Sequence, residues 1–182
     1  MNRVFGAHRV APLLVSWEIG SNVVRQFEIE ARRDGAKFIE AEHMLLALAS
    51  NADSDAGRLL IEAGLDHERL AAALREESRR TLAFAGMSAP DNGPAAINEP
   101  NRLAPGAEAL GLDGAPSLGT SAKMAVRRAM IGSRHDRGRR GRLRATDLLA
   151  GILEADFGTV PRALAIAGID RAALASRAWG FE

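Results

Sequence analysis

An internal repeat is the feature that most constrains how this chain folds, because two of its stretches match at a constant offset without a gap. Gly64 and Gly168 set the offset at 104 residues (168 minus 64), and the apolar stretch 42–48 has its counterpart at 146–153. The matched pairs further downstream are Arg58, Leu60, Ala63, Leu65, Asp66 and Leu70 with Arg162, Leu164, Ala167, Ile169, Asp170 and Leu174. We expect each copy to bury its apolar face against the other.

The composition favours an all-α protein of the cytoplasm. The 182 residues are 47% hydrophobic and include no cysteine and no tyrosine, and the alternation typical of strands is hard to find. The absence of cysteine excludes a disulfide framework and thiolate chemistry and fits a reducing compartment. No apolar run reaches the length of a membrane span or has the form of a secretory signal. We therefore expect a cytoplasmic location and no membrane partner.

Apolar residues at three- and four-residue spacing predict four helices in each half of the chain. In the first helix the stripe is Val23, Val24, Phe27 and Ala31, in the second it is Met44, Leu45 and Leu48, and in the fourth it is Leu70, Ala73 and Leu74. The predicted helices span 17–33, 40–50, 55–63 and 67–80 in the first half, and 121–133, 146–154, 159–167 and 170–179 in the second.

Turn residues set the predicted ends of these helices. Gly64 suits the left-handed position after a helix and Asp66 suits the next N-cap, so 63–66 reads as a compact helix-turn-helix joint that 167–170 repeats. Asp55 is expected to accept backbone N–H bonds at the start of the third helix. Phe38 and Ile39 are expected to form a buried staple before the second helix.

Composition also divides the chain into segments. We predict an N-terminal arm at 1–16, a first repeat at 17–86 and a second repeat at 118–182 that contains a basic loop at 134–145. The segment 87–117 is predicted to be a linker, because it contains Pro90, Pro94, Pro100, Pro105 and Pro116 among many glycines and alanines.

The basic loop allows two interpretations. Between Lys123 and Ala145 nine basic residues face a single acidic one, Asp136, which gives a net charge of +8 (9 minus 1). A nucleic-acid-associated regulator would use such a stretch, and its affinity would fall steeply with salt. A solvated loop or a patch for an acidic protein partner is the other interpretation, because no aromatic residue lies among the arginines. The patch comprises Arg134, Arg137, Arg139, Arg140, Arg142 and Arg144.

Two stretches resemble a known family. Residues 29–48, with Phe38-Ile-Glu-Ala-Glu-His-Met-Leu-Leu-Ala-Leu, and residues 56–66, with Ala-Gly-Arg-Leu-Leu-Ile-Glu-Ala-Gly-Leu-Asp, are similar to the amino-terminal repeat domain (Clp-N) of Clp AAA+ unfoldases of the ClpC type. The resemblance covers about 17–86 and 118–180. It implies two pseudo-symmetric four-helix repeats in one eight-helix bundle, which binds adaptors and substrates.

The resemblance also implies site residues. Some ClpC-type domains bind phosphorylated arginine through the Glu of a Thr-Glu-His motif in each repeat. Here Glu42 and His43 match that motif in the first repeat, while Thr146 stands in the acidic position of the second. Phe5, on the predicted arm, is a candidate partner contact, and Leu118 and Lys123 fall where the family has an adaptor-facing surface.

The sequence indicates neither an enzyme nor a cofactor site. No residues complete a nucleophile constellation around Glu42 and His43, and adjacent helical residues point apart. The four histidines are scattered, so we expect no metal. The nearest string to a phosphate-binding loop, residues 114–121, lacks the required lysine. We therefore expect a stand-alone, non-catalytic protein-binding module, an adaptor, receptor or decoy in proteolysis, whose partners are a ClpC-type unfoldase, its adaptors or its substrates.

Overall fold

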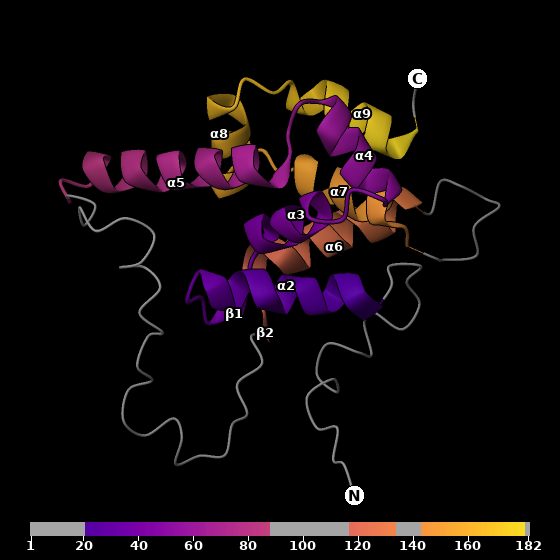
Figure 1. Ribbon diagram of the computed structural model, residues 1–182, viewed down its shortest axis with the longest axis horizontal. Coiled ribbons are helices and arrows are strands. Elements are labelled where there is room, and N and C mark those ends of the chain that lie inside the picture. Colours follow the sequence, from indigo (N-terminus) through magenta and orange to yellow (C-terminus); the bar gives the residue numbers. More distant parts are fainter. Residues whose placement is uncertain (1–20, 88–116, 134–142, 181–182) are drawn as a thin grey trace, which may run out of the picture.

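The protein is all-α in the computed structural model, which describes residues 21–87, 117–133 and 143–180 (Figure 1). The predicted class is thus confirmed. None of the helices in these ranges is long and apolar enough to cross a membrane. The helices of the described residues are α2 (Ser21–Arg33), α3 (Ala41–Ala49), α4 (Asp55–Glu62), α5 (His67–Phe84), α6 (Thr120–Gly132), α7 (Ala145–Leu153), α8 (Thr159–Ile166) and α9 (Arg171–Trp179).

Helix bounds recur at the offset of the sequence match. Helices α7 and α8 begin and end 104 residues after α3 and α4 (145 minus 41 and 159 minus 55 for the starts). Gly64 and Gly168 both adopt a φ of 72°, the left-handed conformation expected of glycine after a helix. Asp66 and Asp170 each cap the following helix by accepting a backbone N–H bond, at 2.8 and 3.0 Å. Both predicted joints are therefore present.

A single core joins the two halves of the chain. Helix α5 packs on α8 and α4 on α9, so each of these pairs takes one helix from each half. The predicted stripes of α2 and α3 are buried in this core except for Val24, which is partly buried. Phe27, Met44, Leu45 and Leu48 are almost completely inaccessible to solvent. Leu148 and Leu149 of α7, in the second half, belong to the same buried cluster, so burial of side chains from both halves stabilises their association.

Arg69 connects the ends of two helices across the halves. Its Nη1 donates to the carbonyl of Gly64, at the end of α4, and its Nη2 donates to the carbonyl of Ala167, at the end of α8 (2.7 and 2.9 Å). A guanidinium suits this place because it supplies several N–H donors, and helix C-termini leave carbonyls without partners. This contact fixes the α4 and α8 joints relative to each other.

Two short strands were not expected. Strand β1 (Phe38–Ile39) pairs in parallel with β2 (Ser117–Leu118), although 79 residues separate the first residues of the strands (117 minus 38). Alternate residues of a strand face opposite sides, so Ile39 is buried while Phe38 is 52% exposed. The prediction that both form a buried staple was therefore wrong for Phe38.

Two helix ends also differ from the prediction. Helix α5 continues one turn beyond residue 80, to Phe84, because its sequence offers no helix breaker before Gly86, which adopts a φ of 73°. The cap of α4 is Ser54, whose Oγ accepts the Gly57 N–H at 3.0 Å, and not Asp55. The extended end of α5 projects from the bundle in Figure 1.

Candidate functional site

The start of α3 holds the first predicted site pair, Glu42 and His43, with their side chains in different environments. His43 is 2% exposed, and its Nδ1 accepts the backbone N–H of Glu40 at 2.9 Å. Its Nε2 lies 3.3 Å from Asp34 Oδ2. Because Nδ1 accepts a hydrogen bond, the proton of the neutral ring sits on Nε2 and points to Asp34. His43 thus stabilises the start of the helix.

The starts of α3 and α6 cap each other. Glu40 Oε2 accepts the backbone N–H and the hydroxyl of Ser121 (2.9 and 2.6 Å), and Ser121 Oγ accepts the N–H of Ala41 at 2.8 Å. Gly119 makes room for this contact, since a Cβ there would lie 1.9 Å from the Glu40 carboxylate. Sequence reasoning missed Glu40 and Ser121, whose only local signal is the Gly-Thr-Ser run at 119–121.

Glu42 is different, because its carboxylate has no side-chain partner among the described residues and lies partly buried. Burial raises the pKa of Glu42 above its usual range. The nearby carboxylates of Glu40 and Asp34 raise it further, whereas the backbone N–H of Glu42 itself and His43 lower it. An ionised Glu42 is thus held at a cost in a negative environment, which favours an approaching cation.

Glu42→Gln is expected to stabilise the protein at neutral pH. A raised pKa means that the folded protein favours protonated Glu42, so wild-type stability is greatest below the unfolded pKa and falls as pH rises through the folded pKa. The glutamine variant lacks this loss. The difference in urea midpoint between variant and wild type should therefore grow from pH 4 to pH 7, roughly the range in which a raised glutamate titrates.

Glu68→Gln is the matched control, because Glu68 occupies the same second helical position in α5 and is exposed. There the helix dipole is the main effect, so the glutamine should cost about 0.5 kcal/mol. If Glu42→Gln destabilised the protein by as much as Glu68→Gln, Glu42 would be an ordinary helix-terminal anion.

The second predicted site, at the start of α7, lacks a carboxylate where α3 has one. Thr146, at the position of Glu42, is half-buried. Asp147, at the position of His43, is buried and its Oδ2 accepts the backbone N–H of Arg144 at 2.8 Å. Each N3 residue therefore stabilises its helix start in the same way, although an imidazole does so in α3 and a carboxylate in α7.

The remaining predicted residues are spread over the molecule. Leu118 is 8% exposed and belongs to the core, so it offers a partner little side-chain surface, whereas Lys123 on α6 is exposed. Arg144 is described and exposed at the start of α7. The predicted arm 1–16, most of the predicted linker and part of the basic patch lie outside the described residues. The predicted site residues concerned are Phe5, Arg134, Arg137, Arg139, Arg140 and Arg142.

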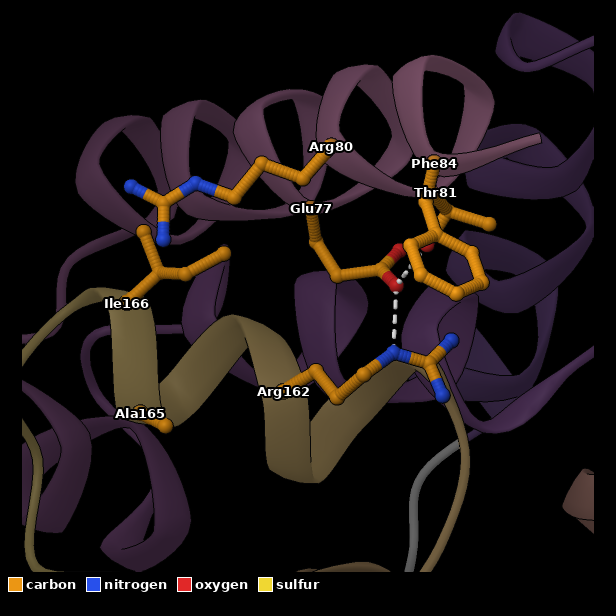
Figure 2. A pocket seen from close by; sticks show the side chains of 7 residues that line it. All are labelled: Glu77, Arg80, Thr81, Phe84, Arg162, Ala165 and Ile166. Atoms are coloured by element: carbon orange, nitrogen blue, oxygen red, sulfur yellow. Dashed lines mark hydrogen bonds and ion pairs between the residues drawn. The ribbon is translucent and has the colours of Figure 1, made fainter. Parts of the chain in front are cut away.

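The residues that line a groove between α5 and α8 were not among the predicted site residues. The groove has a volume of about 700 Å³ and is lined by Glu77, Arg80, Thr81, Phe84, Arg162, Ala165 and Ile166 (Figure 2). Glu77 is 4% exposed, and its Oε1 accepts Arg162 Nε at 2.6 Å and Thr81 Oγ1 at 2.8 Å. The signal in the sequence was Glu77, a carboxylate on the apolar stripe of Leu70 and Ala73. It did not indicate a groove, because the helix was predicted to end at residue 80, before Thr81 and Phe84.

The described side chains form no metal site, and the comparisons with known proteins indicate no ligand. Within the described ranges, no group of three or more histidine or acidic side chains is placed to hold a metal ion. A scan against protein-family models finds no match, and a search among curated proteins finds none either. The residues themselves therefore supply the argument for function.

Proposed function

We propose that the chain is a non-catalytic protein- or peptide-binding module of the Clp proteolysis system, acting as an adaptor, substrate receptor or decoy for a ClpC-type unfoldase. The all-α class agrees with the fold that the sequence resemblance implies, and the helix bounds recur at the repeat offset. The observation that carries the proposal is Glu42, a desolvated carboxylate at the start of α3 with no side-chain partner among the described residues.

The chemistry of Glu42 suits a guanidinium. A carboxylate accepts two parallel N–H bonds from a guanidinium, and such charge-assisted pairs gain strength where water is partly excluded. The carboxylates of Asp34 and Glu40 add to the negative potential at this place. Since Thr146 cannot supply the same acceptor pair, we propose that recognition of arginine, including phosphorylated arginine, occurs at the first repeat alone.

Binding of an arginine-phosphorylated peptide tests this role. We expect the wild type to bind a fluorescent phosphoarginine peptide and Glu42→Gln to bind it about tenfold more weakly, since a bond to a charged group is worth about 1.5–3 kcal/mol. Fluorescence anisotropy measures both affinities, with Glu68→Gln as the control that keeps wild-type affinity. Equal affinities for wild type and Glu42→Gln would remove Glu42 from the site.

Association with an unfoldase tests the wider proposal. Immobilised wild-type protein should retain a purified ClpC-type unfoldase or one of its adaptors at moderate and at high salt. Retention only of nucleic acid, lost as salt rises, would favour the regulator interpretation of the basic stretch instead.

A further inference from the structure

The groove between α5 and α8 combines apolar walls with two arginines. Phe84 is 96% exposed although it is a large aromatic side chain, and Ile166 and Ala165 of α8 continue the apolar surface. The volume of about 700 Å³ lies within the range of ligand sites. In Figure 2 the guanidinium of Arg80 lies beside Ile166 at one end, and that of Arg162 lies toward Phe84 at the other.

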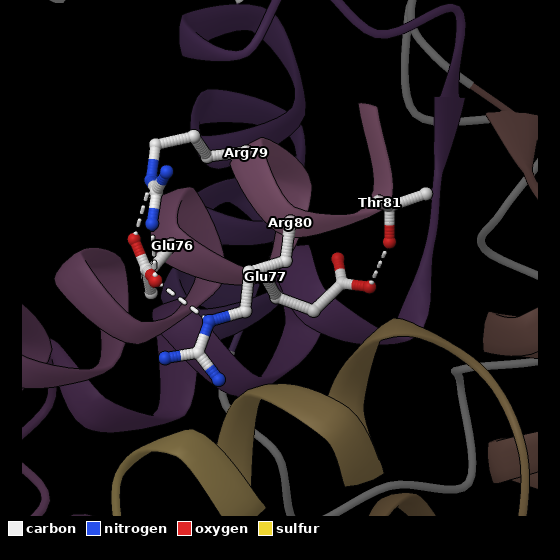
Figure 3. Close-up of polar contacts among 5 residues, drawn as sticks. All are labelled: Glu76, Glu77, Arg79, Arg80 and Thr81. Carbon is white, nitrogen blue, oxygen red and sulfur yellow. Dashed lines mark hydrogen bonds and ion pairs between the residues drawn. The ribbon is translucent and has the colours of Figure 1, made fainter. Parts of the chain in front are cut away.

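Arg80 and Arg162 each use only the Nε–H donor in the contacts with described residues. Arg162 uses Nε for Glu77, and Arg80 uses Nε for Glu76 Oε1 at 2.6 Å. The described residues provide no acceptor for the Nη groups of either arginine. Glu76 forms two further bonds of 2.7 Å with Arg79, which lies outside the groove (Figure 3). Among the side chains that line the groove, two arginines face one glutamate, which leaves a net charge of +1 (2 minus 1). The groove thus favours an anionic ligand.

The ion pairs keep these arginines in place. Hydrogen bonds from Arg79 and then Arg80 lower the pKa of Glu76 to about 2, so Glu76 stays ionised across the physiological range. Glu77, buried at the floor of the groove, similarly fixes the Nε of Arg162. Each guanidinium therefore has one face tied to the protein and its remaining N–H groups available to a ligand.

We propose that this groove binds a peptide segment in which apolar side chains lie between two acidic ones. The apolar side chains contact Phe84, Ala165 and Ile166, and each carboxylate accepts N–H bonds from one arginine. A single-headed anion such as a fatty acid would satisfy one end only, whereas a peptide with two carboxylates satisfies both. No residue of the groove belongs to α3, so this site is independent of Glu42.

Fluorescence anisotropy with a defined peptide tests the proposal. The probe is a labelled, capped peptide with leucines between glutamates, compared with its glutamine analogue. We expect the acidic probe to bind and the glutamine analogue to bind about tenfold more weakly. Phe84→Ala and Arg80→Gln should each weaken the acidic probe by a similar factor, and its affinity should fall with salt.

Matched controls exist for both variants. Phe157 is 92% exposed but lies outside the groove, so Phe157→Ala should leave binding unchanged. Arg79→Gln removes an arginine that also pairs with Glu76 but does not line the groove. This variant should bind the acidic probe with wild-type affinity. Glu42→Gln should retain full affinity, which separates failure of this proposal from failure of the proposed function.

Three results would overturn the proposal. Absence of binding at about 1 mM probe is the first. The second is equal affinity in Phe84→Ala, Arg80→Gln and the control variants, which would place the peptide elsewhere. The third is a dimer in sedimentation that Phe84→Ala dissociates and the probe does not, which would identify a second copy of this chain as the occupant.

Discussion

Replacing Gly151 by alanine is expected to lower the free energy of unfolding by about 3 kcal/mol, the upper part of the range for overpacking. Gly151 is buried in α7 where that helix meets α6. An added Cβ would lie 2.4 Å from the Ala125 carbonyl oxygen and 2.7 Å from the Ala129 nitrogen. Since both are backbone atoms of α6, a rotamer change cannot relieve the contact and the helices must separate.

Gly86→Ala separates crowding from backbone strain. Gly86 has a φ of 73° and no atom within 4 Å of an added Cβ, so alanine there costs only the left-handed conformation, about 1 kcal/mol. Urea denaturation of both variants measures the difference. If Gly151→Ala lost no more stability than Gly86→Ala, α6 and α7 would not approach each other closely enough at Gly151 to exclude a Cβ.

The local signals of the sequence predicted the helices well. Gly64 and Asp66 specify where one helix ends and the next begins, because a left-handed residue and a side-chain cap depend mainly on neighbouring residues. The stripe that includes Met44 and Leu48 predicted which face of α3 is buried, because helical periodicity places such residues on one side.

Contacts between distant residues could not be predicted in this way. Glu40 and Ser121 are 81 residues apart, and neither has a local pattern that identifies the other as its cap. Gly151 looks like a weak point in an apolar helix until α6 is placed against it. The short strand pair has the same origin, since two residues carry too little periodicity to indicate a strand.

The two candidate sites show the same difference between local sequence signals and contacts that only the fold creates. Glu42 was found through its resemblance to a motif, but its raised pKa comes first from burial by the fold and then from the charges of Glu40 and Asp34. The residues of the groove were not predicted, because the groove needs the last turn of α5 and the contact of Glu77 with Arg162 on α8. A charged residue on an apolar helical stripe, as at Glu77, is the sequence signal that should prompt such a search.

Truncation of the core in one half of the chain is expected to destabilise both halves. Met44 in α3 and Leu148 in α7, separated by the repeat offset of 104 (148 minus 44), are both fully buried in the same cluster. Met44→Ala and Leu148→Ala should each lower the free energy of unfolding by about 3 kcal/mol. Met130→Ala, at a side chain that is 40% exposed on α6, is the control and should change it by less than about 0.5 kcal/mol.

Trp179 fluorescence can report whether the two halves of the chain unfold together. The chain has two tryptophans, so a Trp17→Phe background leaves Trp179, in the second half, as the fluorescent probe. The Trp179 indole donates to Glu154 at 2.8 Å, and this contact is lost on unfolding. If the halves share one core, Met44→Ala in the first half shifts the Trp179 transition together with the circular dichroism of the whole chain. A Trp179 transition that stays at its wild-type midpoint would mean that the halves unfold as separate domains, and the packing of α5 on α8 and α4 on α9 would then contribute little stability.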